Sequence, residues 1–147
     1  MNFPRVVMAA VAAWVLYLGV SFVVHTVLLH DLYMQHVAAM RPESEAQGIL
    51  PVGFVFALLG FFAFAYAYAK GYEGGSGMQE GLRFGVIVGL LLCCFGTIWD
   101  YMVWPVSLTL TAAWMVDYII EFALYGALVG AIYKPVPRHT RSTATAV

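Results

Sequence analysis

Two acidic residues, Asp117 and Glu121, interrupt the apolar stretch that runs from Thr111 to Tyr133. They are four residues apart, so on a helix both carboxylates lie on the same side. The stretch is long enough to cross a bilayer, where an acidic side chain such as Asp costs roughly 2.5–3.5 kcal/mol on insertion scales. Something must therefore solvate, neutralise or pair these acids, and the chemistry of the chain depends on what does so.

Two further ionisable residues lie in other apolar stretches at a comparable depth. His25 is near the end of the first stretch, and Asp100 is near the end of the third. Three carboxylates close together cannot all stay ionised without a cation, and no Lys or Arg is predicted at their depth. Their partners are His25 as an imidazolium, the phenols of Tyr101 and Tyr118, a metal ion or another protein. The predicted polar cluster consists of His25, Asp100, Asp117 and Glu121.

Several interpretations of this polar cluster remain open. Its groups can satisfy one another across helices and fix how the bundle packs. They can form a site, open to the outside, for a cation or a small polar molecule. One His with two or three carboxylates is a suitable first shell for a divalent metal ion, with His25, Asp100, Asp117 and Glu121 as ligands. They can also begin a proton or ion path, or form a docking surface for partner chains.

Other cofactor chemistry and catalysis receive less support from the sequence. A buried imidazole can take an axial position on a haem or a pigment, so ligation by His25 is conceivable. A lone His on an apolar helix is, however, more often simply hydrogen-bonded. The adjacent Cys93 and Cys94 form neither a CxxC motif nor a disulfide framework. No nucleophile has a base at useful spacing, so acyl transfer has no support. A non-enzymatic protein is favoured, and an enzyme acting on a lipid-soluble substrate is the third alternative, after an accessory subunit and a ligand- or metal-binding protein.

Four apolar stretches must position the cluster. The chain has 147 residues, of which 63% are hydrophobic and 10% are charged. A soluble domain usually carries about 25% charged residues. The formal net charge of −1 offers no basic field for nucleic acid. The sequence predicts a single all-α domain over residues 1–133, an integral membrane bundle of four antiparallel helices in the lipid bilayer. Its spans are predicted at residues 4–29, 51–69, 81–104 and 111–133.

The segments between and after the spans give three further predictions. Residues 31–40 have a helical pattern that Pro42 would end, which predicts a short interfacial helix on the outer side. The second span is predicted to begin at Pro51, because the first helical N–H has no partner within the helix. The tail over residues 134–147 is polar, Pro-containing and basic, and is predicted to be disordered in the cytoplasm.

Glycines predict how the helices pack. A double small-xxx-small repeat begins the third span, and such repeats let helix backbones approach closely in lipid. A further pair lies in the fourth span. The very short connection over residues 106–110 makes these two spans antiparallel neighbours. The glycines predicted to line helix contacts are Gly81, Gly85, Gly89, Gly96, Gly126 and Gly130.

Positive charge predicts the orientation of the bundle. Four spans place both termini and the glycine-rich turn over residues 70–80 on one side of the membrane. That side carries Arg5, Lys70, Arg83, Lys134, Arg138 and Arg141, and the other carries Arg41. Basic residues favour the cytoplasmic side, so both termini are predicted to be cytoplasmic. The polar cluster then lies in the outer half of the bundle.

Several motifs resemble those of a family of small bacterial membrane proteins with four spans. They are HTVLL with Tyr33 shortly after, MRPESE, YAKGYE and GLRFG. This chain has Thr26 where the family has Gly. In the family a QGLRFG-like run opens the third span, whereas here Glu80 stands between Gln79 and Gly81. The resemblance implies a multi-pass protein of the bacterial inner membrane and carries no function; the acids of the fourth span are not part of it. Positions matching the family pattern are His25, Tyr33, Arg41, Lys70, Gly81, Arg83 and Gly85.

The sequence favours a small accessory or interaction subunit of a larger membrane assembly. Two features point this way: no catalytic set is assembled, and almost no chain lies outside the bilayer. The partners would be other membrane subunits or further copies of this chain. The alternative is a protein that binds a small ligand or a metal ion at a polar site in the outer half of the bundle.

Overall fold

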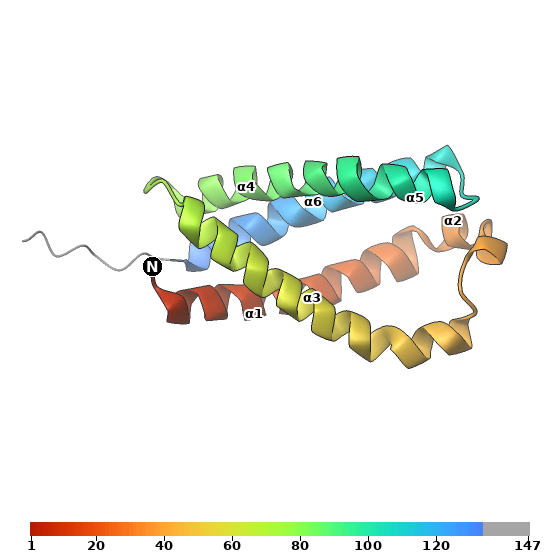
Figure 1. The fold of residues 1–147 in the computed structure, drawn as a ribbon, viewed down its shortest axis with the longest axis horizontal. Coiled ribbons are helices and arrows are strands. Elements are labelled where there is room, and N and C mark those ends of the chain that lie inside the picture. The colour runs from red at the N-terminus through yellow and green to blue at the C-terminus, as the bar shows by residue number, and fades with distance from the viewer. Residues whose placement is uncertain (134–147) are drawn as a thin grey trace, which may run out of the picture.

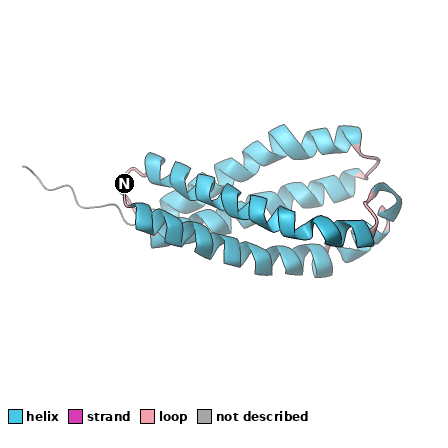
Figure 2. Ribbon diagram, turned by 60° about the horizontal axis from the view of Figure 1, so that its bottom comes forward, coloured by secondary structure: helices cyan, strands magenta, loops and turns pink. Residues whose placement is uncertain are grey.

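The computed structural model describes residues 1–133, and within them the chain is helical without strands (Figure 1, Figure 2). The predicted tail over residues 134–147 lies outside the described residues. The long helices are α1 (Phe3–Val23), α3 (Glu43–Gly71), α4 (Gly77–Leu92) and α6 (Leu108–Ile132). The shorter ones are α2 (His30–Met34), α5 (Ile98–Val103), a 3-10 turn (Val37–Ala39) and two π-helical turns (Val24–Leu28, Cys93–Thr97).

Four helical segments are long and apolar enough to cross a membrane. They run antiparallel, and most of their outward-facing side chains are large and apolar, as contact with lipid requires. The predicted all-α bundle of four membrane helices is therefore confirmed, and the chain is a multi-pass membrane protein. The spans are Phe3–Leu28, Glu43–Gly71, Gly77–Val103 and Leu108–Ile132.

The second span begins earlier than the sequence predicted. Helix α3 starts at Glu43, directly after Pro42, and contains Pro51 in its interior. Glu43 and Glu45 lie in its first turn, where acidic side chains suit the positive end of the helix dipole. The 29 residues of α3 extend about 43 Å at 1.5 Å per residue, which exceeds the roughly 30 Å hydrocarbon core. Its first two turns therefore extend the helix beyond that core, at the end of the bundle that carries α2 and α5. This end is called the outer end below, after the orientation predicted from the sequence, and the opposite end the inner end.

The predicted interfacial helix is present but shorter than expected. The segment forms α2 and a 3-10 turn instead of one helix, and His36 lies between them. The Nδ1 atom of His36 lies 2.8 Å from the carbonyl oxygen of Leu32, and its Nε2 atom accepts the backbone N–H of Ser107 at 3.0 Å. His36 is thus not a solvated loop residue; it joins the first outer connection to the start of α6.

Helices α4 and α6 are in close contact along one face, as the glycine repeats predicted. A Cβ atom added at Gly81 would collide with the carbonyl oxygen of Gly126, and one at Gly77 with that of Gly130. Added Cβ atoms at Gly85 and Gly89 would also meet the α6 backbone, at Phe122 and at Tyr118–Ile119. Gly96 makes no such contact, because an added Cβ would meet nothing within 4 Å.

The two halves of the bundle are packed differently. The buried core lies in the inner half, where the start of α1 meets the ends of α3 and α6. Toward the outer side, α3 follows α1 while α4 stays on α6, so the backbones of α3 and α4 diverge. These two helices meet through side chains nearer their inner ends, where the Tyr68 hydroxyl donates to the carbonyl oxygen of Gly77 at 2.8 Å. Figure 1 shows α3 crossing the bundle at an angle, with its first turns far from α5. The outer half is therefore more open than the inner half. The core residues are Val6, Ala9, Ala10, Ala13, Phe61, Phe64, Ala65, Tyr68, Tyr125, Val129 and Tyr133.

Candidate functional site

Both acids of α6 are buried inside the bundle. Asp117 is 8% exposed and Glu121 is 4% exposed, and both turn toward the first span, Phe3–Leu28. Tyr125, one helical turn further along α6, is completely buried and packs against Phe61 and Phe122. The interior placement expected for the two acids is therefore present. Tyr125 closes the site toward the inner core.

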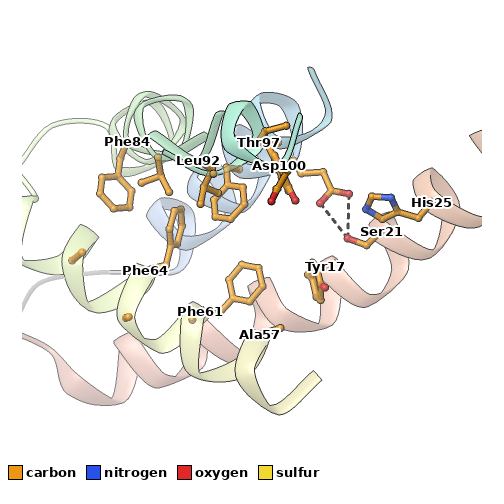
Figure 3. A pocket seen from close by; sticks show the side chains of 18 residues that line it. Tyr17, Ser21, His25, Ala57, Phe61, Phe64, Phe84, Leu92, Thr97 and Asp100 are labelled. Atoms are coloured by element: carbon orange, nitrogen blue, oxygen red, sulfur yellow. Dashed lines mark hydrogen bonds between the residues drawn. The ribbon is translucent and has the colours of Figure 1, made fainter. Parts of the chain in front are cut away.

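Hydroxyl groups from two helices hold the Glu121 carboxylate. The Ser21 hydroxyl of α1 lies 3.2 Å from Oε1 and 3.1 Å from Oε2. The Tyr125 hydroxyl donates to Oε2 at 2.6 Å. Dashed lines in Figure 3 join Ser21 to this carboxylate. Hydroxyl donors stabilise a carboxylate, but they leave its negative charge without a cationic partner.

A second chain of contacts reaches Asp117 from the outer surface. The Trp114 indole N–H donates to the Tyr33 hydroxyl at 2.9 Å, and that hydroxyl lies 2.7 Å from Nδ1 of His25. An indole can only donate, so the Tyr33 oxygen accepts from it and the phenolic hydrogen is free for Nδ1. This assignment leaves the imidazole hydrogen on Nε2, which lies 3.6 Å from Oδ2 of Asp117.

Burial raises the pKa of Tyr33, which lies in α2 outside the membrane spans. The phenol therefore keeps its hydrogen at neutral pH and remains a donor to His25. Both ring nitrogens of His25 face protein groups, one the Tyr33 hydroxyl and the other the Asp117 carboxylate. This favours a hydrogen-bonded imidazole over an axial ligand for haem or a pigment.

Two π-helical turns lie beside the site, one directly after α1 and one between α4 and α5. The turn Val24–Leu28 contains His25, and the turn Cys93–Thr97 contains Thr97. Such turns insert one extra residue into a helix and redirect the side chains around it, and they are frequent at functional sites. Thr97 is 1% exposed, and its hydroxyl has no hydrogen-bond partner among the described residues.

A cavity of about 610 Å³ lies between α1, α3, α4 and α6. Figure 3 shows Phe61 and Phe64 of α3 across from Phe84 and Leu92 of α4, with the polar groups toward the outer end. Glu121 lies on its wall together with Ser21, His25, Thr97 and Tyr118. The cavity thus has an apolar aromatic inner part and a polar outer part.

A second cavity, of about 690 Å³, lies on the outer side of the first. His25, Asp100 and Tyr118 line both cavities, so these residues mark the junction between them. The outer cavity also reaches Arg41 and Glu45, whose side chains are 3.2 Å apart. The two cavities adjoin at His25, Asp100 and Tyr118, and together they are called the outer cleft below.

The four residues of the predicted polar cluster behave differently. His25, Asp117 and Glu121 come together, whereas Asp100 is exposed and lies at the junction of the two cavities. Among residues 1–133, no three His, Cys, Asp or Glu side chains form a group that could hold a metal ion. The geometry therefore gives no support to the metal hypothesis for His25, Asp100, Asp117 and Glu121.

Sequence reasoning missed several residues of the site. Tyr125 follows Glu121 by four residues, a spacing that places the two side chains together on a helix. This contact could therefore have been predicted from the sequence. Thr97 had no such signal, because its position depends on a π-helical turn. Comparisons with protein-family models, curated proteins and solved structures find no match to this chain. The family resemblance drawn from the sequence motifs therefore stays a prediction.

Proposed function

We propose that this protein binds a small lipid-soluble molecule with a polar end in the outer cleft. The observation that carries the proposal is the cavity of about 610 Å³ with an aromatic inner part and Glu121 on its wall. Binding pockets for small molecules are typically concave, of about 300–1,000 Å³, mostly apolar, and marked by a few placed polar groups. This cavity has each of these properties.

The packing of the helices supports entry from the lipid phase. Residues of α3 and α4 line the cavity, and the backbones of these two helices diverge toward its outer end. On the α3 side the cavity is lined by small residues, among them Gly60, Ala63 and Ala67. A molecule dissolved in the bilayer would pass between α3 and α4 with its apolar part first against the aromatic rings. Its polar end would then face His25 and Glu121.

We place the protein in the bacterial inner membrane with both termini in the cytoplasm. In the described residues, Arg5, Lys70 and Arg83 lie at one end of the bundle and Arg41 lies at the other. This asymmetry supports the orientation, because basic residues favour the cytoplasmic side. The outer cleft then opens to the outer half of the membrane. The bacterial source is an expectation from the family resemblance.

The role of an accessory subunit stays a prediction. The apolar side chains on the outer faces of the helices are those that lipid contact alone requires. They single out no partner subunit and no second copy of this chain. The outer cleft is the more specific feature, so ligand binding is the function that the geometry supports best.

Equilibrium dialysis of the detergent-purified protein tests this proposal. The probes are three lipid-soluble molecules of similar shape: tetraphenylphosphonium, tetraphenylborate and triphenylphosphine oxide. At least one should bind saturably to the wild-type protein. Gly60→Trp should weaken that binding by at least about tenfold, because Gly60 lines the cavity and the new ring would fill it.

The matched control is Gly53→Trp. Gly53 lies in the same helix and, like Gly60, has nothing within 4 Å of an added Cβ, but it does not line the cavity. This variant should bind as the wild-type protein does. If no probe distinguishes Gly60→Trp from Gly53→Trp, the outer cleft is not a binding site for such molecules.

A further inference from the structure

We infer that the ligand of the outer cleft is a lipophilic organic cation, with its charge held between the Glu121 carboxylate and the aromatic rings of the cavity. This inference rests on the proposed function and names the chemical class of the ligand. It follows from the charge of the cavity wall, the free acceptor capacity of Glu121, the aromatic rings around it and an unpartnered hydroxyl on the opposite helix.

The charge on the cavity wall is acidic. Asp100 and Glu121 line the cavity, and no Lys or Arg is among the lining residues in the part of the chain that the structure describes. The nearest basic side chain in the outer cleft, Arg41, pairs with Glu45 at 3.2 Å. A cleft lined by one sign of charge with apolar walls concentrates the opposite charge. A cationic ligand would supply the missing positive charge.

His25 does not supply that charge to Glu121. Its Nε2 atom faces Asp117 at 3.6 Å, and its Nδ1 atom meets Tyr33. Asp117 itself does not line the cavity, whereas the His25 ring does. With Nδ1 accepting from Tyr33 and its single hydrogen on Nε2, that ring is neutral and brings no positive charge to the cavity. Glu121 is therefore the buried carboxylate of the cavity that no cation of the described chain offsets.

Glu121 has acceptor capacity left for a ligand. A carboxylate has about four lone-pair sites. The Ser21 hydroxyl has one hydrogen, shared between the two oxygens, and the Tyr125 hydroxyl adds one more. These two donors favour the ionised carboxylate and fix its position without filling its acceptor sites. A cation in the cavity would complete the environment of Glu121.

Aromatic rings surround the apolar part of the cavity. Phe64 of α3 lies 4.9 Å from Phe84 of α4 and 5.7 Å from Phe122 of α6, measured between ring centroids. Tyr17 of α1 lies 5.6 Å from Phe61 by the same measure. All five rings line the cavity. Aromatic faces attract organic cations, and the attraction is strongest where water is excluded.

The same walls argue against a small inorganic cation. A metal ion needs several oxygen or nitrogen ligands to replace its water, and the described residues offer no group of three that could hold one. An organic cation spreads its charge over a large apolar surface and needs fewer such ligands. The buried hydroxyl of Thr97, which has no partner, adds a polar contact on the α4 side of the cavity.

Two probes of the same shape and opposite charge test the inference. Tetraphenylphosphonium and tetraphenylborate are measured by equilibrium dialysis against the wild-type protein, with neutral triphenylphosphine oxide as a third probe. The wild-type protein should bind the phosphonium at least about tenfold more tightly than either other probe. Glu121→Gln should remove this preference while the neutral probe still binds.

The matched control is Glu43→Gln, which removes the same charge from an exposed residue of α3 that lines neither cavity. It should keep the preference for the phosphonium. If the neutral or anionic probe binds the wild-type protein as tightly as the cation, and Gly60→Trp blocks that binding, ligand binding stands and the cation assignment is overturned. If Gly60→Trp changes the binding of no probe, both the proposed ligand binding and the cation assignment are overturned. The wild-type comparison needs no variant, so a Glu121→Gln protein that fails to fold leaves the test decisive.

Discussion

Ser21 of α1 and Glu121 of α6 are 100 residues apart in sequence, yet the Ser21 hydroxyl oxygen lies 3.1 Å from the Glu121 carboxylate. This contact joins the first membrane helix to the last in the outer half of the bundle. It also fixes the carboxylate on the wall of the outer cleft. The stability of the bundle and the geometry of the site therefore depend on the same hydroxyl group.

Ser21→Ala should lower both stability and ligand binding. The change removes a hydrogen-bond donor from a buried carboxylate, and interhelical hydrogen bonds in membranes contribute about 0.6–1.7 kcal/mol. Equilibrium unfolding in mixed detergent should show a decrease in the free energy of unfolding within this range. Thr109→Ala is the control, because Thr109 is exposed on α6. Equal stability of the two variants would show that the Ser21 contact does not hold α1 to α6.

Gly81→Val should separate α4 from α6. The added side chain would collide with the carbonyl oxygen of Gly126, and overpacking of this kind typically costs about 1–3 kcal/mol. Gly53→Val is the control, because an added Cβ at Gly53 meets nothing within 4 Å. Thermal unfolding in detergent, followed by circular dichroism, should show a lower midpoint for Gly81→Val alone. The same midpoint for both variants would contradict the close contact of the two helices.

The fold was largely predictable from the sequence because length and apolarity dominate a membrane span. The first residue of α3 was not predictable in this way, because residues 43–50 form a mostly polar extension of the helix that a search for apolar runs does not detect. Glu43 and Glu45 were an available signal, since acidic residues suit the first turn of a helix. Pro51 was misleading, because it is also tolerated inside a long membrane helix whose backbone finds other partners.

The site was predictable only in part. The cost of burying Asp117 and Glu121 in lipid, with their helical spacing, placed them inside the bundle and near His25. The outer cleft was not predictable, because it depends on the angle at which α3 crosses α1. Both the lipid-facing and the protein-facing sides of a membrane helix are apolar, so hydropathy does not encode that angle. For the same reason, hydropathy does not show whether the rings of Phe64 and Phe84 face lipid or protein.

His36→Ala should loosen the outer connections without unfolding the membrane helices. His36 bridges Leu32 and the backbone N–H of Ser107, so its loss leaves that N–H without its partner. Hydrogen–deuterium exchange followed by mass spectrometry should show faster exchange around residues 35–40 and 105–108 only. His30→Ala is the control, because His30 is exposed. Unchanged exchange in His36→Ala would mean that the bridge contributes nothing to the order of these connections.

Tyr33→Phe should change the tautomer of His25. In the wild-type protein, Trp114 donates to the Tyr33 hydroxyl and that hydroxyl donates to Nδ1, so the imidazole hydrogen should reside on Nε2 facing Asp117. Nitrogen-15 NMR of the labelled protein distinguishes the two tautomers directly. Tyr33→Phe removes the donor and should yield a mixture of tautomers, whereas Tyr101→Phe, at an exposed position, should not. A wild-type imidazole with its hydrogen on Nδ1 would reverse the assigned direction of the chain from Trp114 to Asp117. The hydrogen facing Asp117 would then be absent. An imidazolium with hydrogens on both nitrogens would instead place a cation beside the cleft, and Glu121 would no longer be its unbalanced carboxylate.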